Sequence, residues 1–238
     1  MTKSSPLCSA IIPAAGASTR MGASRSKCLL ELDGKSLLHR VLEVLSTIDQ
    51  IGPIVVMSPP EAEPEALEEF NQLASNFSQV FVTSGGATRQ DSVRLGLNFL
   101  SSLPGPQAEL VLVHDAARAL VTRELVTRCI AEASERQAVT AAVRVIDTVK
   151  RVSSKGIVIE SLKREELWMA QTPQVFSSSL LIKAHKRAED EGIQATDDAT
   201  LIEAIQPVFV VEGERSNIKI TTPEDLVVAE SYLAGLAA

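Results

Sequence analysis

The residues LCSAIIPAAGASTRMGASRSK, numbers 7–27, start as a short apolar run and continue into a loop of small and basic side chains. Residues 7–12 are mostly apolar and end at Pro13, which is typical of a strand buried inside a sheet. The small residues that follow let backbone amides approach a ligand closely, and Arg20 and Lys27 add two positive charges. The stretch therefore predicts a first strand followed by an anion-binding loop.

Apolar runs and helical patterns alternate along most of the chain. Further strands are expected at residues 54–57, 80–83, 110–114, 138–142 and 208–212. Helices are expected at residues 37–45, after 58–65, at 91–100, 122–133 and 180–191, after 196–198, and after Thr222. Strands that alternate with helices form a parallel sheet covered on both faces. The sequence thus predicts an α/β fold with a mainly parallel, Rossmann-like sheet, and all 238 residues are expected to form one domain.

Residues 147–174 interrupt this alternation and predict a protruding β-arm. Two β-rich runs surround the turn at 153–156, and no helical pattern accompanies them. The arm carries alternating apolar residues, which need a cover. A second copy of the chain is the expected cover, and an arm folded back on its own domain is the alternative.

The composition excludes several classes of partner. Apolar residues make up 45% of the chain and the net charge is −7, so a nucleic-acid-binding protein with a basic face is not expected. The sequence has no run of 18 apolar residues, so a membrane-spanning helix is not expected. Three widely spaced cysteines, Cys8, Cys28 and Cys129, lack metal-ligand spacing and are expected to be buried thiols. A cytoplasmic location is expected from this sparse cysteine content.

Two more loops carry candidate binding residues. Gly85 and Gly86 follow a predicted strand, and Arg89 and Ser92 lie at the start of the next helix, where amide donors favour an anion. Asp115 ends another predicted strand, where a carboxylate suits magnesium, a substrate hydroxyl or a helix cap. The phosphate motifs GxxxxGK[ST] and GxGxxG are both absent from the sequence.

The three histidines are expected to be structural rather than catalytic. His114 precedes Asp115, His39 lies in a helical stretch, and His185 lies in a helix that the sequence suggests is exposed.

Taken in order, these segments resemble the 2-C-methyl-D-erythritol 4-phosphate cytidylyltransferase family of the non-mevalonate isoprenoid pathway. The similar segments are Pro13-Ala14-Ala15-Gly16 with Arg20 and Lys27, Gly85-Gly86 with Arg89 and Ser92, His114-Asp115-Ala116-Ala117-Arg118, Asp147-Thr148-Val149-Lys150, Leu167-Trp168, Gln171-Thr172-Pro173-Gln174, and Asn217-Ile218-Lys219-Ile220-Thr221. They extend from about residue 8 to 233. The resemblance implies a nucleotidyltransferase in which the 4-phosphate of a polyol attacks CTP and pyrophosphate leaves.

The resemblance also implies a role for each matching residue. Catalytic residues would be Arg20, Lys27, Asp115, Arg164 and Lys219. Nucleotide-binding residues would be Pro13, Ala14, Ala15, Gly16, Gly85, Gly86, Arg89, Ser92 and Ala116. Residues for the polyol phosphate would be Asp115, Arg118, Thr148, Arg164, Thr172 and Lys219, with Arg164 reaching the site of a second subunit in a homodimer. Magnesium is expected mainly on the CTP phosphates, with no dedicated protein ligands.

Two other functions remain open from the sequence. A cytidylyltransferase for a different polyol phosphate, such as ribitol 5-phosphate, would share the CTP loops. A non-catalytic nucleotide-binding module would keep the fold, but it would not need Arg20, Lys27, Arg164 and Lys219 together.

Overall fold

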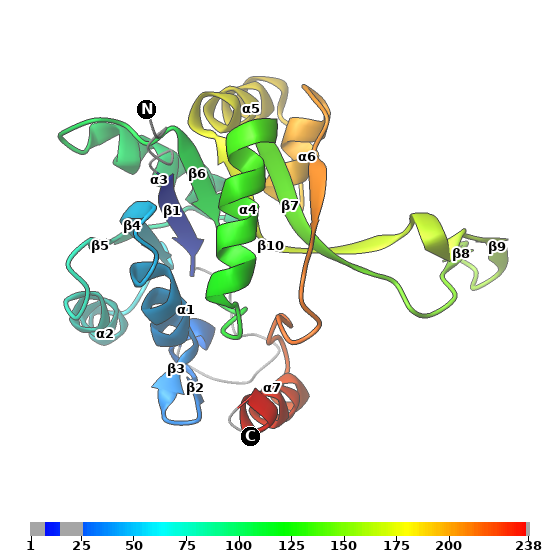
Figure 1. Ribbon diagram of the computed structural model, residues 1–238, viewed down its shortest axis with the longest axis horizontal. Helices are drawn as coiled ribbons and strands as arrows, with labels where there is room; N and C mark the ends of the chain where they lie inside the picture. Colours follow the sequence, from blue (N-terminus) through cyan, green and yellow to red (C-terminus); the bar gives the residue numbers. More distant parts are fainter. Residues whose placement is uncertain (1–7, 15–25, 237–238) are drawn as a thin grey trace.

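A seven-stranded sheet forms the centre of the computed structural model, which describes residues 8–14 and 26–236. In spatial order its strands are β11 (Phe209–Glu212), β7 (Ala138–Arg144), β10 (Trp168–Ser177), β6 (Leu110–Val113), β1 (Cys8–Pro13), β4 (Ile51–Ser58) and β5 (Val80–Ser84). The helices are α1 (Leu37–Ser46), α2 (Pro64–Ala74), α3 (Arg89–Ser102), α4 (Arg123–Arg136), α5 (Ser178–Glu191), α6 (Asp198–Glu203) and α7 (Pro223–Leu236). Figure 1 shows helices on both sides of this sheet. The predicted α/β fold is confirmed.

The two faces of the sheet bury different side chains of the same strands. In β1, Ala10 and Ile12 join one apolar cluster with side chains of α1, α2 and α4, whereas Ile11 joins a second cluster with side chains of α3, α5 and α6. Side chains of a strand point alternately to opposite faces, so a strand covered on both faces must be apolar at successive positions. This requirement explains the continuous apolar run that begins the sequence.

Strand direction brings the polar loops to one edge of the sheet. β1 pairs in parallel with β4 and β6, β4 with β5, and β7 with β11. β10 is antiparallel to β6 and β7, so β6 and β7 share one direction. The carboxyl ends of these parallel strands and the start of β10 therefore lie at the same edge, where ligands bind in open α/β sheets.

The strand β10 was not expected from the sequence as part of the sheet. The predicted arm, 147–174, overlaps it from Trp168 to Gln174, and within this overlap residues 168–170 and Gln174 pair with β7. The pairing shifts register between Ala170 and Gln174. Polar Gln171 and Thr172 followed by Pro173 do not read as a central strand, because proline cannot donate a ladder hydrogen bond.

The remaining part of that segment forms a separate antiparallel hairpin of β8 (Lys150–Val152) and β9 (Val158–Ser161), followed by the short helix η2 (Arg164–Glu166). Figure 1 shows the hairpin extending away from the seven-stranded sheet. A second small hairpin, β2 (Glu31–Leu32) with β3 (Lys35–Ser36), follows η1 (Lys27–Leu29) and precedes α1.

A buried histidine fixes the turn after β6. The Nε2 atom of His114 lies 3.1 Å from the carbonyl oxygen of Arg118, and its Nδ1 atom lies 3.0 Å from the hydroxyl of Thr172. A carbonyl only accepts, so Nε2 carries the proton and Nδ1 accepts from Thr172. The Thr172 hydroxyl in turn accepts from the amide of Asp115 at 3.0 Å. The neutral ring, with one N–H donor and one acceptor nitrogen, makes both of these hydrogen bonds. Burial favours this neutral form and lowers the pKa of His114 to about 4.

This arrangement predicts an acid-sensitive fold. The pKa of His114 lies below its unfolded value of about 6.5, so the unfolded chain takes up the proton first and stability falls as the pH drops from 6.5 toward 4. Urea unfolding should show a loss of about 2–3 kcal/mol between pH 7 and pH 4.5 from this group. Glutamine does not titrate, so the free energy of unfolding of the variant His114→Gln should fall by about 2–3 kcal/mol less than that of the wild type over the same interval. An equal loss in the two proteins would refute the assignment.

Candidate active site

The side chain of Asp115 is the centre of a charged cluster at the carboxyl edge of the sheet. Its Oδ1 atom accepts from Nε of Arg89 at 3.0 Å, and its Oδ2 atom accepts from Nζ of Lys219 at 2.8 Å. The Nε atom of Arg118 lies 4.0 Å from Oδ2. Four charged residues that the sequence nominated from three separate segments therefore meet at one place.

Electrostatics keeps this cluster ionised. Burial by itself would raise the pKa of Asp115, but Arg89 and Lys219 hold it well below its usual range. Burial would lower the pKa of Arg89, but the carboxylates of Asp198 and Asp115 together raise it above its usual value. Three cations face these two carboxylates, so the cluster has one positive charge in excess. A surplus of fixed positive charge at a loop edge suits a phosphate ligand.

Local structure places Arg89 and Arg118. Arg89 is the first residue of α3, which begins at a capping box in which Thr88 and Asp91 satisfy each other's backbone amides. The guanidinium of Arg118 donates to the carbonyl oxygen of Asn217 at 2.8 Å. That bond ties the turn after β6 to the segment that carries Lys219.

The Gly85 and Gly86 loop is closely packed against itself. A Cβ atom on Gly85 would lie 2.8 Å from both the carbonyl oxygen of Ser58 and the hydroxyl of Ser92. The Ser92 hydroxyl accepts from the amide of Gly86 at 3.1 Å and donates to the carbonyl of Thr88 at 2.9 Å. The glycines and Ser92 therefore fix the path of the loop beside Arg89, and their contact with a nucleotide stays a prediction.

The first loop is described only at its two ends. Pro13 ends β1, and Ala14 donates its amide to the carbonyl of Met57 at 3.0 Å. Ala15, Gly16 and Arg20 lie outside the described residues.

After that gap, Lys27 begins η1. The neighbouring Cys28 thiol lies 3.6 Å from the carbonyl oxygen of Ala14, which brings Lys27 back to the end of β1. Ala116 is buried, and its amide lies 3.5 Å from the carbonyl oxygen of Pro13.

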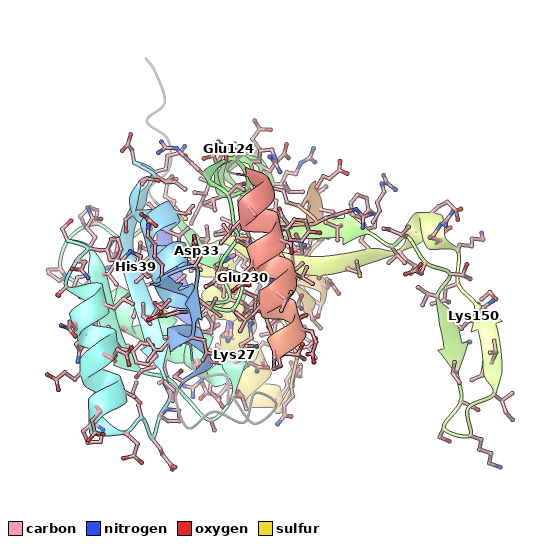
Figure 2. The ribbon with its side chains drawn as sticks, turned by 90° about the horizontal axis from the view of Figure 1, so that it is seen from below. Lys27, Asp33, His39, Glu124, Lys150 and Glu230 are labelled. Atoms are coloured by element: carbon pink, nitrogen blue, oxygen red, sulfur yellow. The ribbon has the colours of Figure 1, made fainter. Side chains whose placement is uncertain are left out.

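The residues predicted to bind the polyol phosphate do not all join the cluster. Thr172 is buried beside Asp115 and uses its hydroxyl on the protein itself. Thr148 is exposed, two residues before Lys150, which Figure 2 shows far from Lys27 at the base of the extended hairpin. Arg164 is also exposed, in η2, and donates to the carbonyl of Ile146 at 2.8 Å. Within one chain, Thr148 and Arg164 thus lie apart from Asp115.

Two members of the cluster were not found from the sequence. Asp198 accepts from Arg89 at 2.7 Å, and His185 lies 2.9 Å from the other carboxylate oxygen of Asp198. The expectation that His185 is exposed was wrong, since its side chain is buried. The sequence does contain a signal that His185 is buried. It lies at helical spacing on the same face of α5 as the apolar residues Leu181, Ala184 and Ala188.

Metal binding by the described residues depends on the ligand set that they offer. In residues 8–14 and 26–236, no group of three or more His, Cys, Asp or Glu side chains could hold a metal ion. Asp115 already pairs with two cations, so a metal ion could bind its oxygens only by displacing Lys219 or Arg89.

Over the same described residues, no helix has the length and apolar character of a membrane span.

Sequence comparison identifies the family. A family model for 2-C-methyl-D-erythritol 4-phosphate cytidylyltransferase matches residues 8–235. The enzyme of that name from Desulforamulus reducens is 44% identical over 226 residues, which is 94% of each chain. That from Trichodesmium erythraeum is 44% identical over 224 residues, 94% of this chain and 97% of the relative.

Solved structures agree with the sequence comparison. The 4-diphosphocytidyl-2C-methyl-D-erythritol synthase of Anaerococcus prevotii superposes with a TM-score of 0.83 at 31% identity, covering 97% of each chain. The 2-C-methyl-D-erythritol 4-phosphate cytidylyltransferase of Thermus thermophilus superposes with a TM-score of 0.76 at 35% identity, covering 94% of this chain and 98% of that one. The chain belongs to the 2-C-methyl-D-erythritol 4-phosphate cytidylyltransferase family.

Proposed function

We propose that this protein joins CTP and 2-C-methyl-D-erythritol 4-phosphate to give 4-diphosphocytidyl-2-C-methyl-D-erythritol and pyrophosphate, a step of isoprenoid biosynthesis. The observation that carries the proposal is the cluster of Arg89, Arg118 and Lys219 around Asp115, in a chain that belongs to this family. Its excess positive charge lies where the strands of the sheet end.

The proposed reaction needs positioning and charge neutralisation more than proton transfer. An oxygen of the polyol's phosphate attacks the α-phosphorus of CTP, a new P–O bond forms, and the bond to the β-phosphate oxygen breaks with its electrons leaving on pyrophosphate. The attacking phosphate is already an anion, so no strong general base is required. The neutral, fully hydrogen-bonded His114 fits this requirement, because it is not placed to take a proton.

The residues of the site would divide between the two substrates. Lys27 and Arg20 would face the charge that grows on the triphosphate, and Arg89 would hold the nucleotide from the start of α3. Lys219 and Arg118 would hold the polyol phosphate, and Asp115 would keep these cations at fixed separations. Bound magnesium would neutralise triphosphate charge, held mainly by the phosphates and water.

We further propose a homodimer formed through the hairpin of β8 and β9. Both strands are exposed along their length. The exposed apolar side chains in and beside this hairpin include Ile146, Ile157, Val158 and Ile159. An isolated two-stranded hairpin is marginally stable in water, and a second copy would supply the cover that it lacks. We also propose a cytoplasmic location, because the three cysteines are free and form no disulfide among themselves, as is usual in a reducing compartment.

Pyrophosphate release tests the proposed function. The protein should release pyrophosphate rapidly with CTP and 2-C-methyl-D-erythritol 4-phosphate, and much more slowly when ATP replaces CTP. Faster release with ribitol 5-phosphate would favour the other polyol substrate. Absence of release with every pair of substrates would favour a nucleotide-binding module.

The variant Lys27→Ala should lower kcat on the order of 10²–10³ while changing KM for CTP much less, because a charge that acts in the transition state is lost. Steady-state kinetics at saturating polyol phosphate would measure both constants. Lys35→Ala is the matched control, since Lys35 forms an exposed ion pair with Glu43 and should leave both constants unchanged. A kcat near that of the wild type in Lys27→Ala would reject the role.

The variant Arg164→Ala should raise KM for the polyol phosphate and leave KM for CTP nearly unchanged. The reason is that Arg164 lies on the segment beyond the sheet, away from the nucleotide loops of its own chain. Arg151→Ala is a suitable control, because Arg151 lies on the same hairpin in an exposed pair with Glu160. A parallel rise in KM for CTP would contradict a role limited to the polyol phosphate.

Subunit mixing tests whether Arg164 acts across the dimer. A heterodimer of Lys27→Ala and Arg164→Ala chains has one site with neither residue and one intact site. At a polyol-phosphate concentration at which each variant alone is nearly inactive, a random one-to-one mixture should therefore recover up to about a quarter of wild-type activity if the sites act independently. If heterodimers form and activity does not return, Arg164 serves its own subunit.

A further inference from the structure

Arg89 has one donor group without a hydrogen-bond partner in the part of the chain that the structure describes. Its Nε donates to Asp115 at 3.0 Å and its first terminal nitrogen donates to Asp198 at 2.7 Å. The second terminal nitrogen is buried and has no hydrogen-bond partner among the described residues. A guanidinium is planar, so two carboxylates bound to two of its nitrogens fix the direction of the third.

Asp198 is the second carboxylate that holds Arg89. Its side chain is 1% exposed, so a substrate cannot reach it without displacing Arg89 and its other neighbours. Its backbone amide lies 3.2 Å from the side-chain oxygen of Gln174 in β10, which ties the first turn of α6 to the sheet. Asp198 is thus anchored by the sheet and acts on Arg89.

His185 completes the arrangement from α5. Its Nε2 atom lies 2.9 Å from Oδ1 of Asp198, and its Nδ1 atom is buried without a partner in the described residues. A carboxylate whose pKa is held low accepts only, so Nε2 of His185 is the donor. This donation occupies Oδ1 and leaves Oδ2 of Asp198 for Arg89. The histidine therefore sets which oxygen of Asp198 the arginine meets.

We propose that Asp198 and His185 are positioning residues that hold Arg89 in the orientation that binds CTP. The inference rests on the proposed function, in which Arg89 contacts the nucleotide. Neither residue touches CTP; each acts through the guanidinium.

Loss of the Asp198 charge would have a consequence inside the cluster. Arg89 would retain Asp115 as its only carboxylate partner, and Asp115 already binds Lys219 and lies near Arg118. Arg89 would turn toward Asp115, and its free nitrogen would turn with it. CTP binding should weaken, whereas the polyol phosphate should bind nearly as before.

The experiment is a double-mutant cycle on CTP binding, measured by titration calorimetry with the full chain. Asp198→Asn should raise the Kd for CTP about 10-fold or more, as expected for loss of a hydrogen bond between charged groups. It should leave KM for the polyol phosphate unchanged and keep kcat at saturating CTP within about threefold of wild type. In an Arg89→Gln background the same substitution should have no further effect, because the residue it acts through is gone.

Two further comparisons separate positioning from folding. Asp197→Asn, the same change one residue earlier at the N-cap of α6, should leave the Kd for CTP unchanged, since Asp197 accepts from Thr200 and Gln174 and not from Arg89. His185→Phe should weaken CTP binding, whereas His185→Gln, which keeps an N–H donor, should restore most of it. This pair decides the question even if Arg89→Gln does not fold.

Unchanged CTP affinity in a folded Asp198→Asn protein would overturn the inference, as would additive losses in the cycle or equal losses in the two His185 variants. Those results would leave the proposed function standing, provided that the wild type binds CTP and releases pyrophosphate. A wild-type protein that does neither would overturn the proposed function and this inference with it.

Discussion

The carboxylate of Asp115, shared between Arg89 and Lys219, is the interaction on which the site depends. It joins the turn after β6, the first residue of α3 and the segment after β11, which are far apart in the sequence. Arg89 and Arg118 are largely buried and Lys219 is half-exposed, and holding these three cations close together is costly unless carboxylates compensate them. Asp115 and Asp198 supply that compensation and leave one positive charge in excess, which a phosphate ligand would neutralise.

The sheet makes this convergence possible. Its parallel strands end at one edge, so loops that are far apart in the sequence, such as those that carry Arg89 and Lys219, meet there. The antiparallel strand β10 begins at the same edge. Its Thr172 and Gln174 side chains accept hydrogen bonds from the backbone amides of Asp115 and Asp198, respectively. The site is therefore built on strands and helix starts, which are more rigid supports than free loops.

Much of this could be predicted from the sequence, and the exceptions have physical reasons. Apolar runs that end in glycine or acidic residues located the strands and the loops that meet at Asp115. Strand β10 was missed because Gln171, Thr172 and Pro173 break its pattern. Asp198 was missed because two acids at a helix start read as a cap, and Asp197 is indeed the cap of α6. A pairing such as that of Arg89 with Asp198 depends on packing between distant elements, which one sequence does not display.

The most direct test of the central claim is the effect of Asp115→Asn on the free energy of unfolding in urea at pH 7. If this carboxylate compensates Arg89, Lys219 and Arg118, the variant should be about 3–5 kcal/mol less stable, because buried cations lose their partner. Asp33→Asn is the control: Asp33 pairs with Arg40 at the surface, where its side chain is 78% exposed, and its loss should change stability by less than about 1 kcal/mol. Equal stability of Asp115→Asn and the wild type would contradict the claim that the cluster depends on this carboxylate.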